Sequence, residues 1–164
     1  MAMSHALGEL ALAAGYNGSH GPASAKANQT VTAVSTASSE QKDYFVERDG
    51  VRYAGTHLLI DLWDATNLDN LQIVEDALRG AALAAGATIL NVDLHHFEPN
   101  GGISGVVVLA ESHISIHTWP ERGFAALDIF MCGSCNPYKG IPVLKEHFRP
   151  EKVQLTEHKR GLVL

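Results

Sequence analysis

The sequence is poor in cysteine, in basic residues and in long apolar runs, and each shortage excludes a class of protein. Its two cysteines, Cys132 and Cys135, are too few for a disulfide framework. Lys and Arg number 12 against 18 Asp and Glu, a formal net charge of -6, which argues against a nucleic-acid binder. No stretch approaches the roughly 20 apolar residues that cross a bilayer, and the N-terminus lacks the basic region of a signal peptide. Together these shortages predict a cytoplasmic protein without nucleic-acid or membrane partners.

Large apolar side chains are also scarce in residues 1–43, which are rich in Ala, Ser, Gly, Thr and Asn. Such a segment buries too little surface to offset the entropy lost on ordering, so we predict a disordered N-terminal extension there. Residues 44–164 are predicted to form a single domain. Across the whole 164-residue chain 46% of the residues are apolar, which is enough for a sizeable core.

Apolar periodicity and turn residues divide this domain into strands and helices. An apolar face at helical spacing follows a cap at Asn67 or Asp69, and Gly86 is placed to end this helix. Asn136, followed by proline, indicates the start of a second helix. The predicted strands are 56–63, 88–97, 103–119, 124–131 and 152–158. This order, with hairpin-length links, predicts an α+β two-layer sandwich in which an antiparallel sheet carries helices on one face. The other face is then available to a second copy, so a homodimer is expected.

Most of the reactive side chains gather between residues 104 and 132. They are Ser104, Glu111, Ser112, His113, Ser115, His117, Glu121, Asp128 and Cys132. Two interpretations are open for this segment. Its alternation of polar and apolar residues is typical of the solvated face of an antiparallel sheet. The concentration of nucleophiles, acids and histidines also suits an active site.

Two runs of this segment resemble the signature of prokaryotic S-adenosylmethionine decarboxylases. They are Ala110-Glu-Ser-His-Ile-Ser-Ile-His-Thr-Trp-Pro-Glu121 and Ala125-Ala-Leu-Asp-Ile-Phe-Met-Cys-Gly133. The resemblance extends upstream through Ile103-Ser-Gly-Val-Val-Val and, more loosely, Gly55-Thr-His-Leu-Leu-Ile-Asp, and it covers about residues 52–160. It implies an enzyme that converts S-adenosylmethionine to its decarboxylated form and CO2 for spermidine biosynthesis. It also implies a homodimer of cleaved protomers.

The resemblance implies a covalent pyruvoyl group made from Ser112. Decarboxylation of an α-amino acid needs an electron sink, and a pyruvoyl ketone supplies one by forming a Schiff base with the substrate amine. The Ser112 hydroxyl is expected to attack the Glu111 carbonyl and to convert the peptide bond into an ester. Loss of the Ser112 α-proton then releases Glu111 as a carboxylate. Water then hydrolyses the dehydroalanine left at position 112, and ammonia is released. The products are chains 1–111 and 112–164, the second capped by the ketone.

The family pattern assigns further roles to three residues of this chain. His117 is implied to take the α-proton during processing, which suits a group with a near-neutral pKa. Ser104 is implied to help stabilise the processing intermediate. Cys132 is implied to return a proton to the α-carbon after CO2 leaves. Regular alternation places Ser112 and His117 on opposite faces of a strand, so we expect a bulge or bend between them.

Two residues are implied to bind the substrate. Glu121 matches a family glutamate that accepts hydrogen bonds from the ribose hydroxyls. Phe97 resembles the family aromatic residue that stacks on adenine. The alternative interpretation of Phe97 is an ordinary buried core phenylalanine.

Other interpretations keep part of this description. The same fold and pyruvoyl chemistry also suit a decarboxylase of ornithine or arginine, and an unprocessed homologue suits a non-catalytic regulatory subunit. Cys132-Gly-Ser-Cys135 has the spacing of a redox pair or of half a zinc site. Nothing in the spacing of the histidines defines a tetrahedral site, so we predict no metal. Cys135, Asp61 and Asp128 receive no role.

Overall fold

The computed structural model describes residues 43–163. The predicted extension therefore lies outside the described residues, apart from Asp43. The described part opens with a small antiparallel hairpin, β1 (Val46–Arg48) and β2 (Val51–Tyr53). Val163 bridges Arg52 of this hairpin, so the two ends of the described chain meet there.

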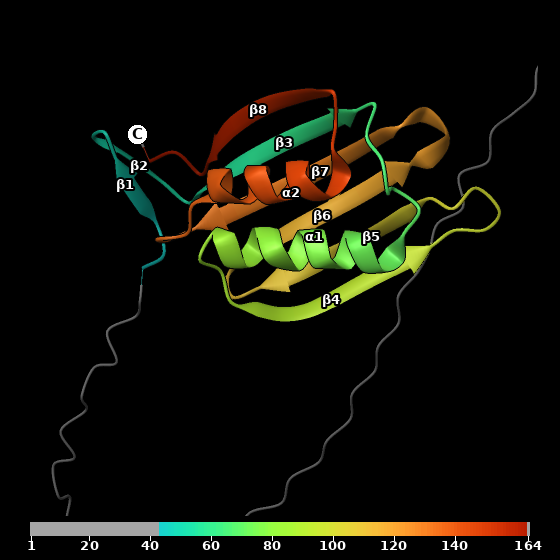
Figure 1. The fold of residues 1–164 in the computed structure, drawn as a ribbon. Helices are drawn as coiled ribbons and strands as arrows, with labels where there is room; N and C mark the ends of the chain where they lie inside the picture. Colours follow the sequence, from blue (N-terminus) through green and yellow to red (C-terminus); the bar gives the residue numbers. More distant parts are fainter. Residues whose placement is uncertain (1–42, 164) are drawn as a thin grey trace, which may run out of the picture. The chain divides into compact units, whose positions relative to one another are not determined.

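A six-stranded sheet forms the body of the domain (Figure 1). Its strands are β3 (Gly55–Trp63), β4 (Ile89–His96), β5 (Ile103–Leu109), β6 (Ser112–Trp119), β7 (Phe124–Cys132) and β8 (Lys152–Arg160). Their order across the sheet is β4-β5-β6-β7-β3-β8, and every neighbouring pair is antiparallel. The predicted α+β class is confirmed.

Two helices cover one face of the sheet, as Figure 1 shows, and no helix among residues 43–163 covers the other face. They are α1 (Leu71–Ala84) and α2 (Gly140–Phe148); two short 3-10 turns, η1 (Pro120–Arg122) and η2 (Pro137–Lys139), join strands and helices. We call the uncovered side the outer face. No helix among residues 43–163 has the length and apolar character needed to cross a membrane.

The predicted cap of the first helix was wrong, whereas its end was right. The side chain of Asn70 accepts a hydrogen bond from the Ile73 amide at 3.1 Å and so caps α1. Asn67 instead has a positive φ of 62°, a turn conformation that precedes the cap. Gly86, with φ 83°, follows the last helical turn as expected for a glycine after a helix C-terminus.

The core lies between the sheet and the two helices. Alternate residues of β3, which lies between β7 and the edge strand β8, point into it, and Leu58, Ile60 and Leu62 are almost completely buried. Leu78 of α1 and Phe148 of α2 are buried against the same layer. Each such side chain contributes about 1.5–3 kcal/mol through the apolar surface that it removes from water. This layer holds β6 and β7 in a fixed register.

The predicted strand 103–119 is in fact two strands. β5 and β6 form a hairpin in which Leu109 pairs with Ser112, so that Ala110 and Glu111 make a two-residue turn. Glu111 has a φ of 63°, the left-handed conformation that such tight turns require. Neither turn residue is glycine, asparagine or proline, and the apolar run Val106–Ala110 leads directly into the alternating residues after Glu111. The sequence therefore carries no signal that separates the two strands.

Candidate active site

The Glu111–Ser112 junction contacts the end of β7. The Cys132 thiol donates a hydrogen bond to the Glu111 carbonyl oxygen, with 2.9 Å between Sγ and O. The Ser112 hydroxyl oxygen accepts a hydrogen bond from the Cys132 amide at 3.3 Å and lies 3.6 Å from Sγ. Ser112 itself is only 8% exposed. We call Glu111, Ser112 and Cys132 the cleavage half-site, because a hydroxyl, a thiol and a polarised peptide carbonyl meet there.

The backbone at this junction is unusual. Glu111 is one of the non-glycine residues with a positive φ, at 63°. For an L-residue the left-handed region is sparsely populated and costs of order 1 kcal/mol or more. The surrounding hairpin must therefore hold the Glu111 peptide in a conformation that it would not otherwise prefer.

A second group of reactive residues lies on the outer face. Ser104 of β5 is paired directly with His117 of β6, and on its other side with His95 of β4. Directly paired residues in antiparallel strands have side chains on the same face, about 4.5–5.5 Å apart. We call Ser104 and His117 the histidine half-site. No hydrogen bond of the His117 ring occurs among residues 43–163.

The two half-sites are far apart within one chain. The pairing of β6 with β5 and with β7 is regular from one end to the other, so the predicted bulge between Ser112 and His117 was wrong. Ser112 points into the core side of β6 and His117 away from it. At about 3.4 Å per residue, five residues of strand separate them by about 17 Å. The family roles of Ser112 and His117 thus fall on groups that a single chain keeps apart.

A row of stacked rings runs along the outer face and contains His117. The ring of His117 lies 4.2 Å from Trp119 at an interplanar angle of 13°, and 6.3 Å from Phe97 at 6°. Trp119 stacks in turn on Phe124 at 5.2 Å, and Phe124 on Trp63 at 4.3 Å. Phe97 is 44% exposed, so its interpretation as a buried core residue was wrong.

Glu121 lies at the end of this ring row. It belongs to the 3-10 turn η1 that follows Trp119, and the left-handed Gly123 closes the turn. Glu121 lines a surface cavity of about 700 Å³ together with Trp119 and Arg122. The carboxylate predicted to bind ribose therefore faces a space large enough for part of a nucleoside.

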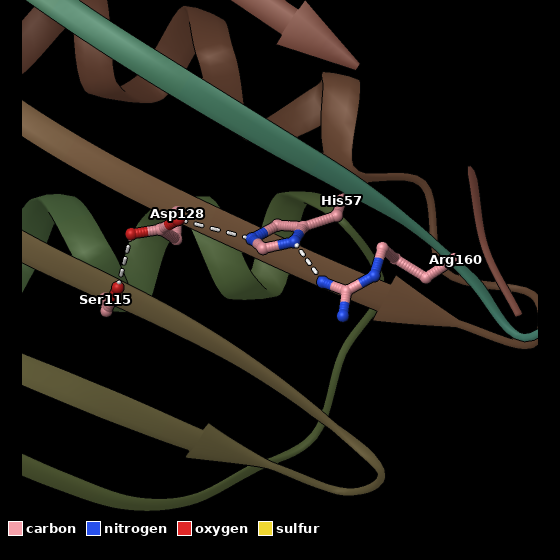
Figure 2. Close-up of polar contacts among 4 residues, drawn as sticks. All are labelled: His57, Ser115, Asp128 and Arg160. Carbon is pink, nitrogen blue, oxygen red and sulfur yellow. Dashed lines mark hydrogen bonds and ion pairs between the residues drawn. The ribbon is translucent and has the colours of Figure 1, made fainter. Parts of the chain in front are cut away.

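A chain of polar contacts crosses the outer face over four strands (Figure 2). Ser115 donates to one carboxylate oxygen of Asp128 at 3.0 Å, and His57 Nε2 lies 3.3 Å from the other. Arg160 Nη1 lies 3.1 Å from His57 Nδ1. Because a guanidinium only donates, Nδ1 must accept a hydrogen bond, and Nε2 must carry the ring proton and donate a hydrogen bond to Asp128. Sequence reasoning assigned Asp128 no role, since its partners Ser115 and His57 come from two other strands.

His113 extends this polar group towards the cleavage half-site. Its pKa is lowered from the ordinary value of 6.5, chiefly by burial and also by the neighbouring His57, while Asp128 opposes the shift. The His113 ring is also 5.6 Å from the ring of Phe130. Burial thus disfavours the protonated form of His113 and lowers its pKa.

The C-x-x-C pair is not a disulfide. Cys132 and Cys135 are both free thiols, and burial is the main cause that raises the pKa of the Cys135 thiol. In the part of the chain that the structure describes, no three side chains of His, Cys, Asp or Glu are arranged to hold a metal ion. Cys132 instead contacts the Glu111 carbonyl, as described above.

Comparison with known proteins gives one consistent result. The family model for S-adenosylmethionine decarboxylase matches residues 56–161. The S-adenosylmethionine decarboxylase proenzyme of Thermomicrobium roseum is 46% identical over 111 residues, which cover 67% of this chain and 96% of that protein. The proenzyme of Methanococcus aeolicus is also 46% identical, over 68% of this chain and 97% of its own. The crystal structure of the Aquifex aeolicus adenosylmethionine decarboxylase matches with a TM-score of 0.61 and 34% identity, over 68% of this chain and 94% of that one.

Proposed function

The chain belongs to the S-adenosylmethionine decarboxylase family, and we propose that Ser112 is the residue from which its pyruvoyl group is made. Members of this pyruvoyl-dependent family are made as proenzymes, and the activity is decarboxylation of S-adenosylmethionine for spermidine biosynthesis. One observation carries the assignment to Ser112: the Cys132 thiol polarises the Glu111 carbonyl beside the Ser112 hydroxyl. This contact places a hydroxyl nucleophile next to a peptide carbonyl that accepts a hydrogen bond.

Self-cleavage follows from the groups of the cleavage half-site. The Ser112 hydroxyl attacks the Glu111 carbonyl, and the negative charge that develops on this oxygen is stabilised by the Cys132 thiol at 2.9 Å. The C–N bond then breaks, which leaves Glu111 joined to Ser112 through an ester. When a base removes the Ser112 α-proton, the electron pair forms a double bond within Ser112 and the Glu111 carboxylate leaves. Water hydrolyses the dehydroalanine that remains at position 112, ammonia leaves, and the pyruvoyl ketone is formed at the start of chain 112–164; chain 1–111 is the other product.

The cleavage half-site also fits the group that Ser112 is proposed to become. Cys132 is a proton donor 3.6 Å from the Ser112 oxygen and has no competing role in a disulfide. The pyruvoyl ketone supplies the electron sink for the electron pair that CO2 leaves on the α-carbon. Cys132 is then the residue proposed to protonate that carbon.

The site is proposed to be complete only in a homodimer. His117 and Ser104 lie about 17 Å along the sheet from Ser112. The side chain of His117 therefore cannot reach the Ser112 of its own chain. The outer face carries exposed apolar side chains, among them Leu59 at 38%, Trp63 at 39% and Val108 at 39%. Such a face marks an interface, and a two-fold axis presents the same patch from both copies. Packing outer face on outer face brings the histidine half-site of one copy to the cleavage half-site of the other.

Co-expression of two inactive chains tests this arrangement. Ser112→Ala removes the nucleophile and His117→Ala removes the base, so neither variant is expected to form the pyruvoyl group by itself. In a mixed dimer, the Ser112 of the His117→Ala chain faces an intact His117 supplied by its partner. Intact-mass measurement should therefore find the His117→Ala chain cut after Glu111, and the Ser112→Ala chain whole. If neither chain is cut in verified mixed dimers, the shared site is wrong.

The substrate assignment rests on two further residues. The rings of Phe97 and His117 are almost parallel and 6.3 Å apart, close to the about 7 Å that a planar base needs between two rings. Glu121 faces a cavity beside Trp119, which suits hydrogen bonds from ribose hydroxyls. Both features favour S-adenosylmethionine over ornithine or arginine, which have neither a base nor a ribose. Assays of CO2 release from the three substrates separate these alternatives.

Intact mass of the purified, denatured protein tests the proposal directly. Cleavage after Glu111 should give two chains. The mass of the smaller chain should be lower by one ammonia than that of residues 112–164 with an ordinary N-terminal serine. A chain that stays whole on incubation would instead support the non-catalytic regulatory subunit. Because both cysteines are free thiols, we also infer a cytoplasmic location, where thiols stay reduced.

A further inference from the structure

The orientation of His117 is set by rings rather than by hydrogen bonds. An imidazole that moves protons is commonly held by a hydrogen bond at its second nitrogen. No such bond exists for His117 among residues 43–163. Its ring is instead stacked on Trp119, 4.2 Å away and only 13° from parallel. The face of Trp119 therefore determines the plane in which the His117 nitrogens lie.

Trp119 is itself held in place. It stands two residues after His117 on β6, so the two side chains share the outer face. Trp119 is paired across the sheet with Phe124 of β7, and their rings stack at 5.2 Å. Trp63 of β3 packs on the far side of Phe124 at 4.3 Å. Three strands thus contribute to a rigid backing behind the His117 ring, whereas Phe97 on the other side lies at 6.3 Å.

We propose that Trp119 is a positioning residue that orients His117 for proton removal during self-cleavage. This inference rests on the proposed function, in which His117 is the base that removes the Ser112 α-proton. Indole has a single N–H donor and no acceptor, so Trp119 does not move that proton itself. It acts through His117 by preventing rotation of the imidazole out of the plane of the stack. Misplacement of a reacting group by about 1 Å costs about a hundredfold in rate.

The inference predicts which step slows when the stack is lost. Ester formation needs the cleavage half-site and Ser104, whereas the ring contacts of Trp119 among residues 43–163 are with His117 and Phe124. Removal of the α-proton needs His117, so a variant without the indole ring should stop at the ester. Hydroxylamine detects that ester: its nitrogen attacks the Glu111 carbonyl and the bond to the Ser112 oxygen breaks. The products are a hydroxamate on Glu111 and a chain 112–164 that begins with ordinary serine.

The experiment compares Trp119→Leu and Trp119→Phe with the unaltered chain, and uses Leu83→Ala as a control. Leu83 is an exposed apolar residue of α1, 65% exposed, so its removal leaves the outer face intact. Intact mass, with and without hydroxylamine, gives the fractions of pyruvoyl, ester and uncut chain over time. Trp119→Leu should form pyruvoyl about 10 to 100 times more slowly and accumulate hydroxylamine-sensitive ester. Trp119→Phe, which keeps a flat ring, should stay within about threefold of the unaltered chain, as should Leu83→Ala.

Three results would overturn the inference. They are pyruvoyl formation by Trp119→Leu at the unaltered rate, loss of cleavage in Trp119→Leu without trapped ester, and a Trp119→Phe chain as slow as Trp119→Leu. The second result would mean that Trp119 is needed before the ester forms, and not for removal of the α-proton by His117. Failure of the unaltered chain to cleave would instead refute the proposed function, so the two failures are distinguishable.

Discussion

At the scale of single residues, the cleavage half-site combines a strained peptide with a donor aimed at its oxygen. Glu111 has a positive φ because it occupies a two-residue turn, and that turn exposes its carbonyl at the end of the sheet. Cys132 is the last residue of β7, so its thiol reaches the same end. The two strand ends thus meet where bond rearrangement is proposed.

Cys132→Ala should slow self-cleavage at least tenfold. It removes the thiol that stabilises charge on the Glu111 carbonyl oxygen, and loss of a stronger oxyanion donor costs about 10²–10³. Cys132→Ser keeps a donor and should retain most of the cleavage rate. The measurement is intact mass over time, with Cys135→Ala as the control for loss of a thiol. Cleavage of Cys132→Ala at the unaltered rate would contradict the role of the thiol in this step.

Phe97→Ala should weaken substrate binding more than it lowers the turnover rate. Stacking of a base on an aromatic side chain is worth about 1–3 kcal/mol, so KM for S-adenosylmethionine should rise about tenfold. Phe45, which has the same 44% exposure but lies outside the sheet, offers a matched control in Phe45→Ala. Steady-state kinetics of both variants check this expectation. An unchanged KM for Phe97→Ala would remove the residue from the substrate site.

At the scale of strands, the close pairing of β4 with β5 sets the position of the histidine half-site. Gly105 follows Ser104, and a Cβ atom added there would lie 2.1 Å from the Asp93 carbonyl oxygen of β4. Because the obstacle is backbone, no side chain can move aside. The absence of a side chain at Gly105 is therefore what lets β4 approach the strand that carries Ser104.

Gly105→Ala should destabilise the fold by about 1–3 kcal/mol, the usual cost of overpacking. It should also slow self-cleavage, because the strand that carries Ser104 must shift. Chemical denaturation and intact mass give the two quantities. Val108→Ala, on an exposed position of the same strand, is the control and should change stability much less. A Gly105→Ala chain with unaltered stability would show that the strands can separate without cost.

The strand-crossing polar group on the outer face predicts a pH dependence. Burial lowers the pKa of His113, so the unfolded chain binds a proton at this residue more readily than the folded chain does. Stability is therefore present above the ordinary pKa of 6.5 and is lost as the pH falls below it. His113→Gln should flatten this loss. Denaturation curves between pH 5 and 8 are best measured in a Ser112→Ala background, which stays uncut; a parallel fall in both chains would assign the loss elsewhere.

At the scale of the whole molecule, a site shared between two copies makes the rate of self-cleavage depend on the formation of the dimer. If one chain sufficed, the rate in freshly refolded protein would not change on dilution. For a shared site, the initial rate should rise with protein concentration until the dimer is saturated. Intact mass at concentrations spanning about a hundredfold, with sedimentation of the Ser112→Ala chain in parallel, tests this. A concentration-independent rate in a chain that sediments as a monomer would contradict the shared site.

Several features of this fold follow from local sequence and were predicted from it. Thr56 to Trp63 is a mostly apolar run of strand length. Gly86 follows the end of a helix because the positive φ needed there depends only on the residue itself and its neighbours in the chain. The order of strands and helices predicts the α+β class for the same reason. The motif around Ser112 was identified by its resemblance to a family. The resemblance implies roles for the residues but does not give the distances between them.

The sequence by itself thus determined the fold class and most of the strands and helices, and the resemblance supplied the proposed reactive residues. Only the tertiary structure decided that Ser112 meets Cys132, 20 residues away, and that His117, five residues away, is out of reach. It also decided that Trp119 stacks on His117 and that Asp128 joins Ser115 to His57. The physical reason is that hairpin turns and strand register are set by pairing between distant segments. A one-residue change of register moves every side chain to the opposite face.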